Sequence, residues 1–427
     1  MELVSDSLLA EESLSEVRDL PRQRVGVASG RSVVALEVAV GWESEIARHA
    51  DVQVLQKLNL WRDVLPPFLE TGLVGQTVGH RFEHRCAPGE FIPAYQPSDC
   101  LLVPRRRFNT RLLRSGVVEP RAGRYYPKGF IAGVRDFYPE DRTPFRLAAI
   151  EGDDLRVELN PPLAGRSLTV RATLLDAWDP GAERGGQCHD FAALVTENGP
   201  GMQARWRGQP TDFWADAPFA RLAAADDSAF YGNARLVDHI DRTAARQIAQ
   251  LYGRLLPRGG RLLDLMSSWK SHLPAALEPS LVSGLGMNAE ELAANPALGE
   301  RVVHDLNLDP CLPFADAAFD GAVCTVSVEY LVRPFEVFEE IARVLRPGAR
   351  FVVTFSNRWF PPKVINLWQN CHEFERMGIV LEYFLRSGRF AQLETYSLRG
   401  LPRPEDDKYA GQMALSDPVY AVWGERQ

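Results

Sequence analysis

Polar side chains follow two apolar segments in the C-terminal half of the sequence, where each segment would end as a strand. Ser327, Glu329 and Tyr330 come at the end of the run 321–328, and a further polar group follows the run 350–355. Ligands bind at the carboxyl ends of the strands in open α/β sheets. Because a glutamate there can remove a proton from an oxygen or nitrogen group, we predict a ligand site with Glu329 as a candidate base.

The segment between these two runs has the pattern of a helix. Residues 334–345 carry apolar side chains at helical spacing, and Pro334 suits the first turn, where its missing N–H needs no partner. Pro347 and Gly348 then stop the helix. A strand, a helix and a second strand form a crossover unit, which predicts an α/β fold with a parallel sheet.

Length and composition limit the remaining possibilities. A chain of 427 residues predicts two domains with linkers. A net charge of −8 argues against a nucleic-acid partner. No apolar run approaches the roughly 20 residues that span a bilayer, and the acidic first residues do not resemble a secretory signal. We therefore expect a cytoplasmic protein without a membrane partner.

The cysteines do not predict a metal site. All six are widely separated and no C-x-x-C pair occurs, so we expect reduced thiols rather than disulfides or bound zinc. Cys188-His189-Asp190 brings three reactive residue types together, but neighbours in sequence rarely converge on one ligand. We accordingly expect no metal ligands in this chain.

The N-terminal half predicts a small α+β domain after a polar tail at residues 1–23. A short helix is expected at residues 61–73. The β-rich segments are 33–40, 76–86, 145–149, 155–159 and 167–178. In the last of these, apolar and polar residues alternate, which is typical of a sheet with one face in water.

Three stretches of this half resemble the FKBP-type peptidyl-prolyl isomerases that carry an inserted flap. They are residues 67–79, Pro93-Ala94-Tyr95 and the element Pro162-Leu163-Ala164-Gly165 with its flanks. The resemblance implies an FKBP-like domain over residues 24–180, with a flap at about 103–159. It also implies that Tyr95 and Trp61 contact proline-containing peptides. Active isomerase, degenerate peptide-binding module and structural appendage remain open alternatives.

Two motifs in the C-terminal half resemble the class I S-adenosylmethionine-dependent methyltransferases. They are Leu-Pro-Phe-x-Asp-x-x-Phe-Asp at residues 312–320 and Arg-Val-Leu-Arg-Pro-Gly at residues 343–348. The resemblance implies a Rossmann-like methyltransferase domain over residues 230–427, which a linker at 181–229 joins to the first domain. S-adenosylmethionine is the implied cofactor.

Further elements of this domain are expected from the same pattern. An amphipathic helix begins at Phe230, with Val237, Ile240 and Ile248 on its apolar face. Strands are expected at 261–265, 302–306 and 417–422.

The resemblance also implies where the cofactor binds. The family's glycine-rich loop is replaced by residues 266–272, which contain no glycine, and Gly286 stands where the family has an acid for the ribose hydroxyls. Asn288 is the candidate replacement for that acid, and Asp305 matches the residue that meets the adenine amino group. The implied cofactor-binding residues are Asp264, Ser267, Ser268, Trp269, Gly286, Met287, Asn288, Asp305, Leu306 and Ser327.

His272 and Tyr330 join Glu329 as candidate catalytic residues. We therefore expect a methyltransferase of unknown acceptor, either a small molecule or a protein, fused to a peptide-binding domain. The alternative is a peptidyl-prolyl isomerase or chaperone-type binding protein whose methyltransferase domain is a scaffold. A third hypothesis is that the first domain delivers the acceptor to the second.

Overall fold

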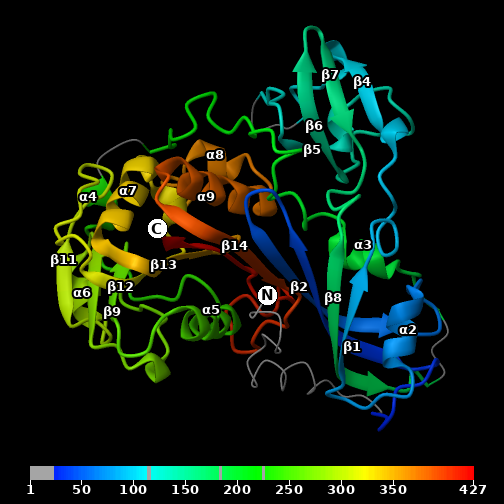
Figure 1. The fold of residues 1–427 in the computed structure, drawn as a ribbon, viewed down its shortest axis with the longest axis horizontal. Coiled ribbons are helices and arrows are strands. Elements are labelled where there is room, and N and C mark those ends of the chain that lie inside the picture. The colour runs from blue at the N-terminus through cyan, green and yellow to red at the C-terminus, as the bar shows by residue number, and fades with distance from the viewer. Residues whose placement is uncertain (1–23, 113–116, 182–184, 224–226) are drawn as a thin grey trace.

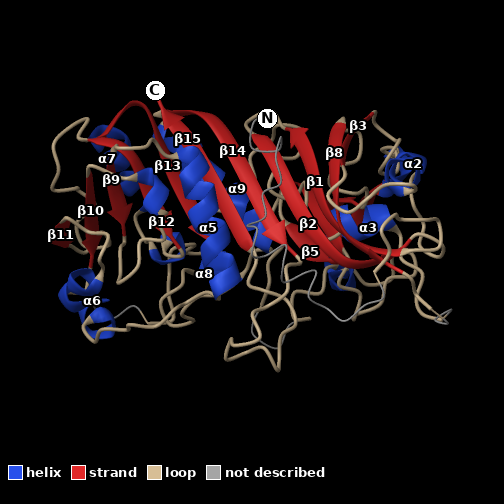
Figure 2. Ribbon diagram, turned by 90° about the horizontal axis from the view of Figure 1, so that it is seen from below, coloured by secondary structure: helices blue, strands red, loops and turns tan. Residues whose placement is uncertain are grey.

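A single large sheet runs through the protein (Figures 1 and 2). The computed structural model describes residues 24–112, 117–181, 185–223 and 227–427, so the predicted tail at 1–23 lies outside the described residues. From one edge to the other the eleven strands are β11 (Glu300–Val303), β10 (Leu281–Gly286), β9 (Arg261–Leu265), β12 (Phe319–Thr325), β13 (Leu345–Phe355), β15 (Val419–Arg426), β14 (Phe390–Arg399), β2 (Arg48–Asn59), β1 (Val33–Glu43), β8 (Leu168–Trp178) and β3 (Arg81–Cys86).

The predicted crossover unit is confirmed. β12 and β13 are parallel neighbours, and α7 (Pro334–Val344) connects them with Pro334 in its first turn. Residues of β13 alternate between two cores: Phe351 and Val353 pack with α7 and α9 (Glu373–Ser387), while Val352 packs with α5 (Arg242–Leu255). Helices therefore cover both faces of this part of the sheet.

The helix expected from Phe230 begins later than predicted. The α5 helix starts at Arg242, because the Asp241 carboxylate accepts a hydrogen bond from the Ala244 N–H at 3.0 Å and caps the first turn. Val237 precedes the helix and is 52% exposed. The spacing of Val237 and Ile240 therefore does not mark a helix. Between Asp227 and Asp241, the described residues form one short helix, α4 (Asp227–Tyr231).

The predicted helix at 61–73 is also shorter, running from Pro67 to Leu73 as α2. Pro66 and Pro67 explain this start, because the residue before a proline is disfavoured in helical conformation while proline itself suits the first turn. The other helices are α3 (Phe191–Thr196), α6 (Ala289–Ala294) and α8 (Asn366–Gln369). Among the described residues, every helix falls short of the length and apolar character that crossing a bilayer demands.

The N-terminal strands extend the C-terminal sheet. β2 pairs in parallel with β14, from Arg48 opposite Glu394 to Gln53 opposite Arg399. The β1, β8 and β3 strands continue outward in antiparallel order. The two halves therefore share one hydrogen-bonded sheet.

Buried polar side chains reinforce the junction between β2 and β14. The Asp51 carboxylate accepts hydrogen bonds from Trp42 Nε1 and from Ser397 Oγ, each at 2.8 Å. Burial raises the pKa of Asp51, and the Trp42 and Ser397 donors oppose that shift. Beside it, His49 Nδ1 lies 2.8 Å from Thr395 Oγ1, and Arg48 pairs with Glu394. These contacts select one register for the two strands.

The span expected to form a flap contributes a separate small sheet, drawn in cyan to green at the upper right of Figure 1. Its strands are β4 (Cys100–Pro104), β7 (Asp154–Glu158), β6 (Pro144–Glu151) and β5 (Tyr125–Pro127). The small sheet has its own core, with Phe108 and Phe145 fully inside it. It is held to α9 by Arg124, whose Nε donates to Glu375 at 3.0 Å.

The segment predicted as a linker packs into the protein. Met202 and Phe213 join the core that contains α7 and α9, and Phe191 of α3 joins the core of β1 and β8. Arg205 forms two hydrogen bonds with Glu382 of α9, at 2.7 and 2.8 Å. Between residues 185 and 223, therefore, the chain follows a fixed path across the C-terminal half.

Candidate active site

A cavity lies where β9, β10 and β12 end, at the carboxyl edge of the parallel strands. The ten residues that the sequence predicts for cofactor binding all line it, as do His272 and Tyr330. Further residues, outside the predicted sets of cofactor-binding and catalytic residues, line the same cavity. They include Asp227, Tyr231, Arg235, His239, Glu291, Asn307 and Phe360.

The loop after β9 forms its tight path without glycine. Met266 and His272 adopt positive φ angles of 55° and 53°, a left-handed conformation that usually favours glycine. The Ser267 N–H donates to Leu285 O at 2.7 Å, which joins the loop to β10. The required glycine stands on β10 instead: a Cβ on Gly286 would lie 2.1 Å from Ser267 O. Gly286 therefore allows two backbone segments to touch beneath the cavity.

Asp264 lies at the centre of a hydrogen-bonded network in this loop. Its Oδ2 accepts from Ser267 Oγ and from Ser271 Oγ, both at 2.6 Å. Asn295 Nδ2 in turn donates to Ser268 O and to Ser271 Oγ. Burial raises the pKa of Asp264 to about 6, although the two hydroxyl donors oppose the shift. The carboxyl thus changes charge close to neutral pH inside the cavity.

Asn288 is a helix cap, which corrects its predicted role as a free partner for ribose hydroxyls. Its Oδ1 accepts from the N–H groups of Glu290 and Glu291 at 2.9 Å, and its Nδ2 donates to Tyr231 O at 2.8 Å. Both ends of the amide are therefore committed to holding α6 and the segment around Tyr231. In sequence, a capping asparagine and a ligand-binding one look alike.

Glu291 is the acidic residue that the sequence reasoning missed. It lies three positions after the Asn288 cap and lines the cavity. One carboxylate oxygen accepts from Ser268 Oγ at 2.6 Å and the other from the Arg235 N–H at 2.7 Å. The Asn-x-x-Glu spacing of a capping box was the available signal, but here the glutamate turns towards the loop after β9.

Asp305 presents a carboxylate to the cavity just after β11. Its Oδ1 accepts from the Asn307 N–H at 2.8 Å and, more weakly, from the Leu308 N–H at 3.4 Å. These bonds fix the side chain and leave the cavity-facing carboxylate able to accept from a ligand. Leu306 beside it is buried in the core.

Two of the three candidate catalytic residues reach the cavity. Burial lowers the pKa of His272 to about 4, so its imidazole is neutral at neutral pH. The Tyr330 hydroxyl accepts from the Phe360 N–H at 2.9 Å, which leaves its own O–H free to donate. Burial raises the pKa of Tyr330 well above its ordinary value, so it acts as a neutral donor.

Glu329 is not brought to the cavity, which corrects its prediction as a catalytic base. The side chain is 1% exposed and is absent from the cavity wall, and its Oε2 has no hydrogen-bond partner among the described residues. Burial raises the pKa of Glu329 to about 8, with Arg376 opposing the shift. A 3-10 turn at Val328–Tyr330 follows β12, so the neighbouring side chains of residues 329 and 330 point in different directions.

Glu329→Gln is expected to remove a pH-dependent loss of stability. At pH values between the ordinary pKa of 4.5 and the raised pKa of about 8, the Glu329 carboxyl is ionised in the unfolded chain and protonated in the folded chain. The free energy of unfolding therefore falls as pH rises through that window, by about 1.4 kcal/mol per pKa unit. Denaturant unfolding at several pH values should show the variant and the wild type equal near pH 5. By about pH 9 the variant should be the more stable, and parallel curves would contradict this assignment.

The opposite wall of the cavity is aromatic. Tyr231, Phe360 and Tyr330 contribute to it, and the Arg235 guanidinium lies 4.4 Å from the ring centre of Phe230. His239 stands at the same wall, 5.3 Å from Phe360 between ring centres, and burial lowers its pKa. Trp368 is fully buried in the core and does not line the cavity.

Tyr95 and Trp61, the predicted peptide contacts, lie in the N-terminal half away from this cavity. The Tyr95 hydroxyl donates to Glu158 at 2.9 Å, and Arg207 covers its ring. Arg62 lies over the Trp61 ring, 5.4 Å from its centre. Peptide binding by these two residues stays a prediction.

Comparison with known proteins assigns a class to the C-terminal half. Residues 276–353 match the family model described as "Methyltransferase domain". Together with the parallel sheet and the cavity at its carboxyl edge, this match supports a Rossmann-like fold of the class I methyltransferase type for the C-terminal half. S-adenosylmethionine is the cofactor that this family implies.

The curated relatives match only part of the chain. The demethylmenaquinone methyltransferase of Paenarthrobacter aurescens (strain TC1) is 36% identical over 61 residues, which are 14% of this chain and 22% of that protein. Methyltransferase GfsG of Streptomyces halstedii is 27% identical over 158 residues, covering 33% of this chain and 55% of its own length. This chain thus spans less than two thirds of either relative.

Solved structures resemble the chain weakly. A possible histamine N-methyltransferase from Thermotoga maritima aligns with 44% of this chain and 90% of its own, at 13% identity and a TM-score of 0.33. A methyltransferase from Mesorhizobium loti aligns with 43% and 98%, at 18% identity and a TM-score of 0.30. None of the findings supports the resemblance of residues 24–180 to the FKBP-type isomerases.

Proposed function

We propose that the protein is an S-adenosylmethionine-dependent methyltransferase, acting on a small-molecule or protein acceptor. The proposal rests on the close approach of Gly286 to Ser267 O. This approach brings the loop after β9 against β10 and forms the floor of a cavity suited to the cofactor, although the usual glycine-rich loop is missing. The chemistry of the cavity agrees with this, because Asp264, Glu291 and Asp305 place three carboxyl groups around it.

Each carboxyl group suits one part of the cofactor. Asp264 lies beside the loop after β9 and would hold the positively charged methionine end. Glu291 follows Gly286 on the next element and would accept from the ribose hydroxyls in place of the missing acid. Asp305 would accept from the adenine amino group. The cofactor supplies an activated methyl group when bound, so the protein has to bind, align and exclude water.

The acceptor would enter along the aromatic wall of Tyr231, Tyr330 and Phe360. The Tyr330 O–H can donate to an acceptor oxygen or nitrogen and so orient it. His272, neutral at neutral pH, is the candidate for removing a proton from the acceptor. A role for the N-terminal half in presenting a protein acceptor is compatible with the shared sheet.

Titration of the full chain with S-adenosylmethionine and S-adenosylhomocysteine in a calorimeter tests the proposal. We expect micromolar binding, and a stabilisation of about 2.7 kcal/mol at a hundredfold excess over Kd. Asp305→Asn keeps an oxygen for the Asn307 N–H but loses the charge, and should weaken binding about tenfold. Asp309→Asn is the matched control, because Asp309 lies on the same loop outside the cavity wall and accepts from the Cys311 N–H. No heat and no thermal shift with either ligand would refute the proposal.

Binding of S-adenosylmethionine should strengthen as pH rises from about 5 to about 7. The cofactor carries a sulfonium and an ammonium group, so the ionised form of Asp264, with its pKa of about 6, binds it better than the neutral form. Calorimetry across this range should show rising affinity for the wild type and a flat profile for Asp264→Asn. A flat wild-type profile would show that Asp264 does not meet the cationic part.

A further inference from the structure

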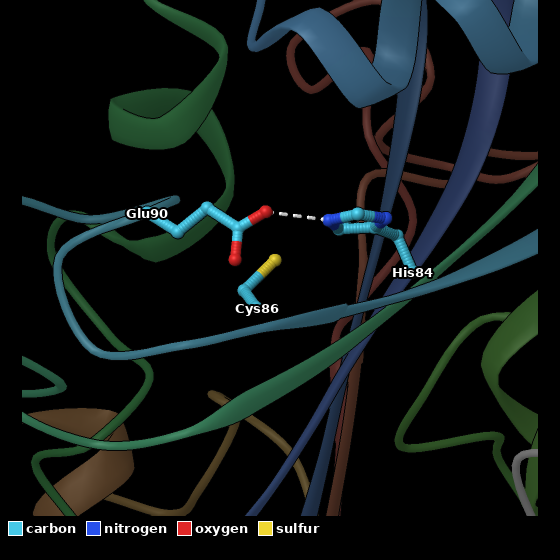
Figure 3. Close-up of side chains that lie close together, drawn as sticks. All are labelled: His84, Cys86 and Glu90. Carbon is cyan, nitrogen blue, oxygen red and sulfur yellow. Dashed lines mark hydrogen bonds and ion pairs between the residues drawn. The ribbon is translucent and has the colours of Figure 1, made fainter.

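Three side chains with metal-binding atoms converge at the outer edge of the large sheet. His84 and Cys86 lie two positions apart on β3, so both point to the same face, and Glu90 folds back over them from the following turn (Figure 3). Their ligand atoms all lie within 4.8 Å of one another. Figure 3 shows the Cys86 sulfur beside the hydrogen bond that joins the Glu90 carboxylate to the His84 ring.

The backbone and the neighbouring helix hold these side chains in place. The Ala87 N–H donates to one Glu90 oxygen at 2.9 Å, while the other oxygen lies 2.7 Å from His84 Nε2. The His84 ring stacks on Phe68 of α2, with ring centres 4.4 Å apart and planes 6° from parallel. This stack limits rotation of the His84 ring. Glu90 therefore presents one anchored and one available oxygen.

The distances suit a small tetrahedral ion. Zinc bonds of about 2.3 Å to sulfur and about 2.0 Å to nitrogen or oxygen place tetrahedral ligand atoms about 3.3–3.5 Å apart. The His84–Glu90 pair has to open by less than about 1 Å, and no separation in the group, all being within 4.8 Å, has to close by more than about 1.5 Å. Both shifts lie within the reach of side-chain rotation, since Glu90 is exposed and His84 is half-buried.

The total charge of the three ligands also suits a divalent cation. A neutral imidazole, a thiolate and a carboxylate carry two negative charges, which one divalent cation neutralises. Nitrogen, sulfur and oxygen together favour zinc over magnesium or calcium, which prefer oxygen alone. Cys86 is 3% exposed and forms a closed floor, while Glu90 at the rim leaves a fourth position open to water.

We propose that His84, Cys86 and Glu90 form a zinc-binding site with one open coordination position. The site is independent of the proposed methyl transfer. β3 is the eleventh strand of the sheet and β9 the third, so about 40 Å separates them at about 4.8 Å per strand. The bound ion would stabilise the turn after β3. It would also bind a water or an exchangeable ligand at the β3 edge of the large sheet.

Titration of the metal-free full chain with Co²⁺ tests the proposal, because cobalt replaces zinc and reports a thiolate ligand by a charge-transfer band in the near ultraviolet. We expect one ion per chain, visible bands typical of a tetrahedral site, and displacement by Zn²⁺. Cys86→Ala should abolish the charge-transfer band. Glu90→Gln keeps an acceptor for the Ala87 N–H and should weaken binding about 100-fold while the protein remains folded.

Cys188→Ala and Cys311→Ala are the matched controls, because both thiols are exposed and lie outside the group. Each should leave the spectrum unchanged. The proposal is overturned if wild-type protein binds no cobalt, if the band survives in Cys86→Ala, or if it disappears in either control. Affinity for S-adenosylhomocysteine should be equal in wild type and Glu90→Gln, so the outcome does not depend on the proposed methyltransferase function.

Discussion

Gly286→Ala is expected to abolish cofactor binding. The added Cβ would lie 2.1 Å from Ser267 O, far inside van der Waals contact, and the obstructing atom belongs to the backbone. The loop after β9 must then move away from β10 and lose the hydrogen bond from the Ser267 N–H to Leu285 O. Because that loop also carries the donors to Asp264, the cavity floor and its carboxyl group shift together.

We expect the affinity for S-adenosylhomocysteine to fall at least about 100-fold and the free energy of unfolding to fall by about 1–3 kcal/mol. Calorimetry and denaturant unfolding measure the two effects. Gly284→Ala is the matched control on the same strand, because its Cβ would meet the end of the Leu298 side chain at 2.4 Å rather than backbone. That control should lose some stability and keep its affinity. Equal affinity in wild type and Gly286→Ala would contradict the proposed floor.

A chain cut between residues 223 and 227 should require both pieces for solubility. The C-terminal piece alone would expose β14 as a bare edge, with Thr395 and Ser397 of its buried face unpaired. Unprotected edges of this kind pair with other chains and aggregate. Tyr396 and Leu398 would also lose the apolar neighbours that β2 contributes.

We therefore expect residues 227–427 to be insoluble when produced alone and soluble when produced together with residues 24–223. Size-exclusion chromatography of the co-produced pieces should give one complex of the mass of the whole chain. The uncut protein under the same conditions is the control. A C-terminal piece that is monomeric and unfolds cooperatively at the Tm of the whole chain would show that the shared sheet contributes little.

Local patterns predicted the parts of the fold that depend on neighbouring residues. Pro334 fixes the start of α7, and the helix ends at Val344, shortly before the predicted stop at Pro347-Gly348, which lies within β13. The start of α5 was misplaced because the spacing of Val237 fits a helix, whereas the Asp241 cap decides where the helix begins. The junction of β2 with β14 could not be predicted, because strand pairing between distant segments leaves no local pattern.

For the candidate site, too, some features could be predicted from the sequence and others depend on distant contacts. The resemblance to the methyltransferases implied the cofactor-binding residues, and these residues line the cavity. Their roles depend on contacts across the fold. A side chain at position 286 would collide with Ser267 O, which explains why glycine stands there in place of an acid. The Asn288 side chain caps α6. His84, Cys86 and Glu90 do not form a recognised ligand spacing in sequence, and the turn after β3 is what brings Glu90 back to the other two.

The junction of β2 with β14 has a consequence for how the chain is made. Residues that meet there are 346 positions apart, as in the pair of Arg48 with Glu394. At about 5–20 residues per second, a ribosome delivers β14 roughly 20–70 s after β2. Throughout that interval the edge of β2 that pairs with β14 has no partner strand, and Asp51 lacks its hydrogen bond from Ser397. Contacts so distant in sequence also form slowly. The nascent N-terminal half should therefore depend on chaperones that shield strand edges until synthesis ends.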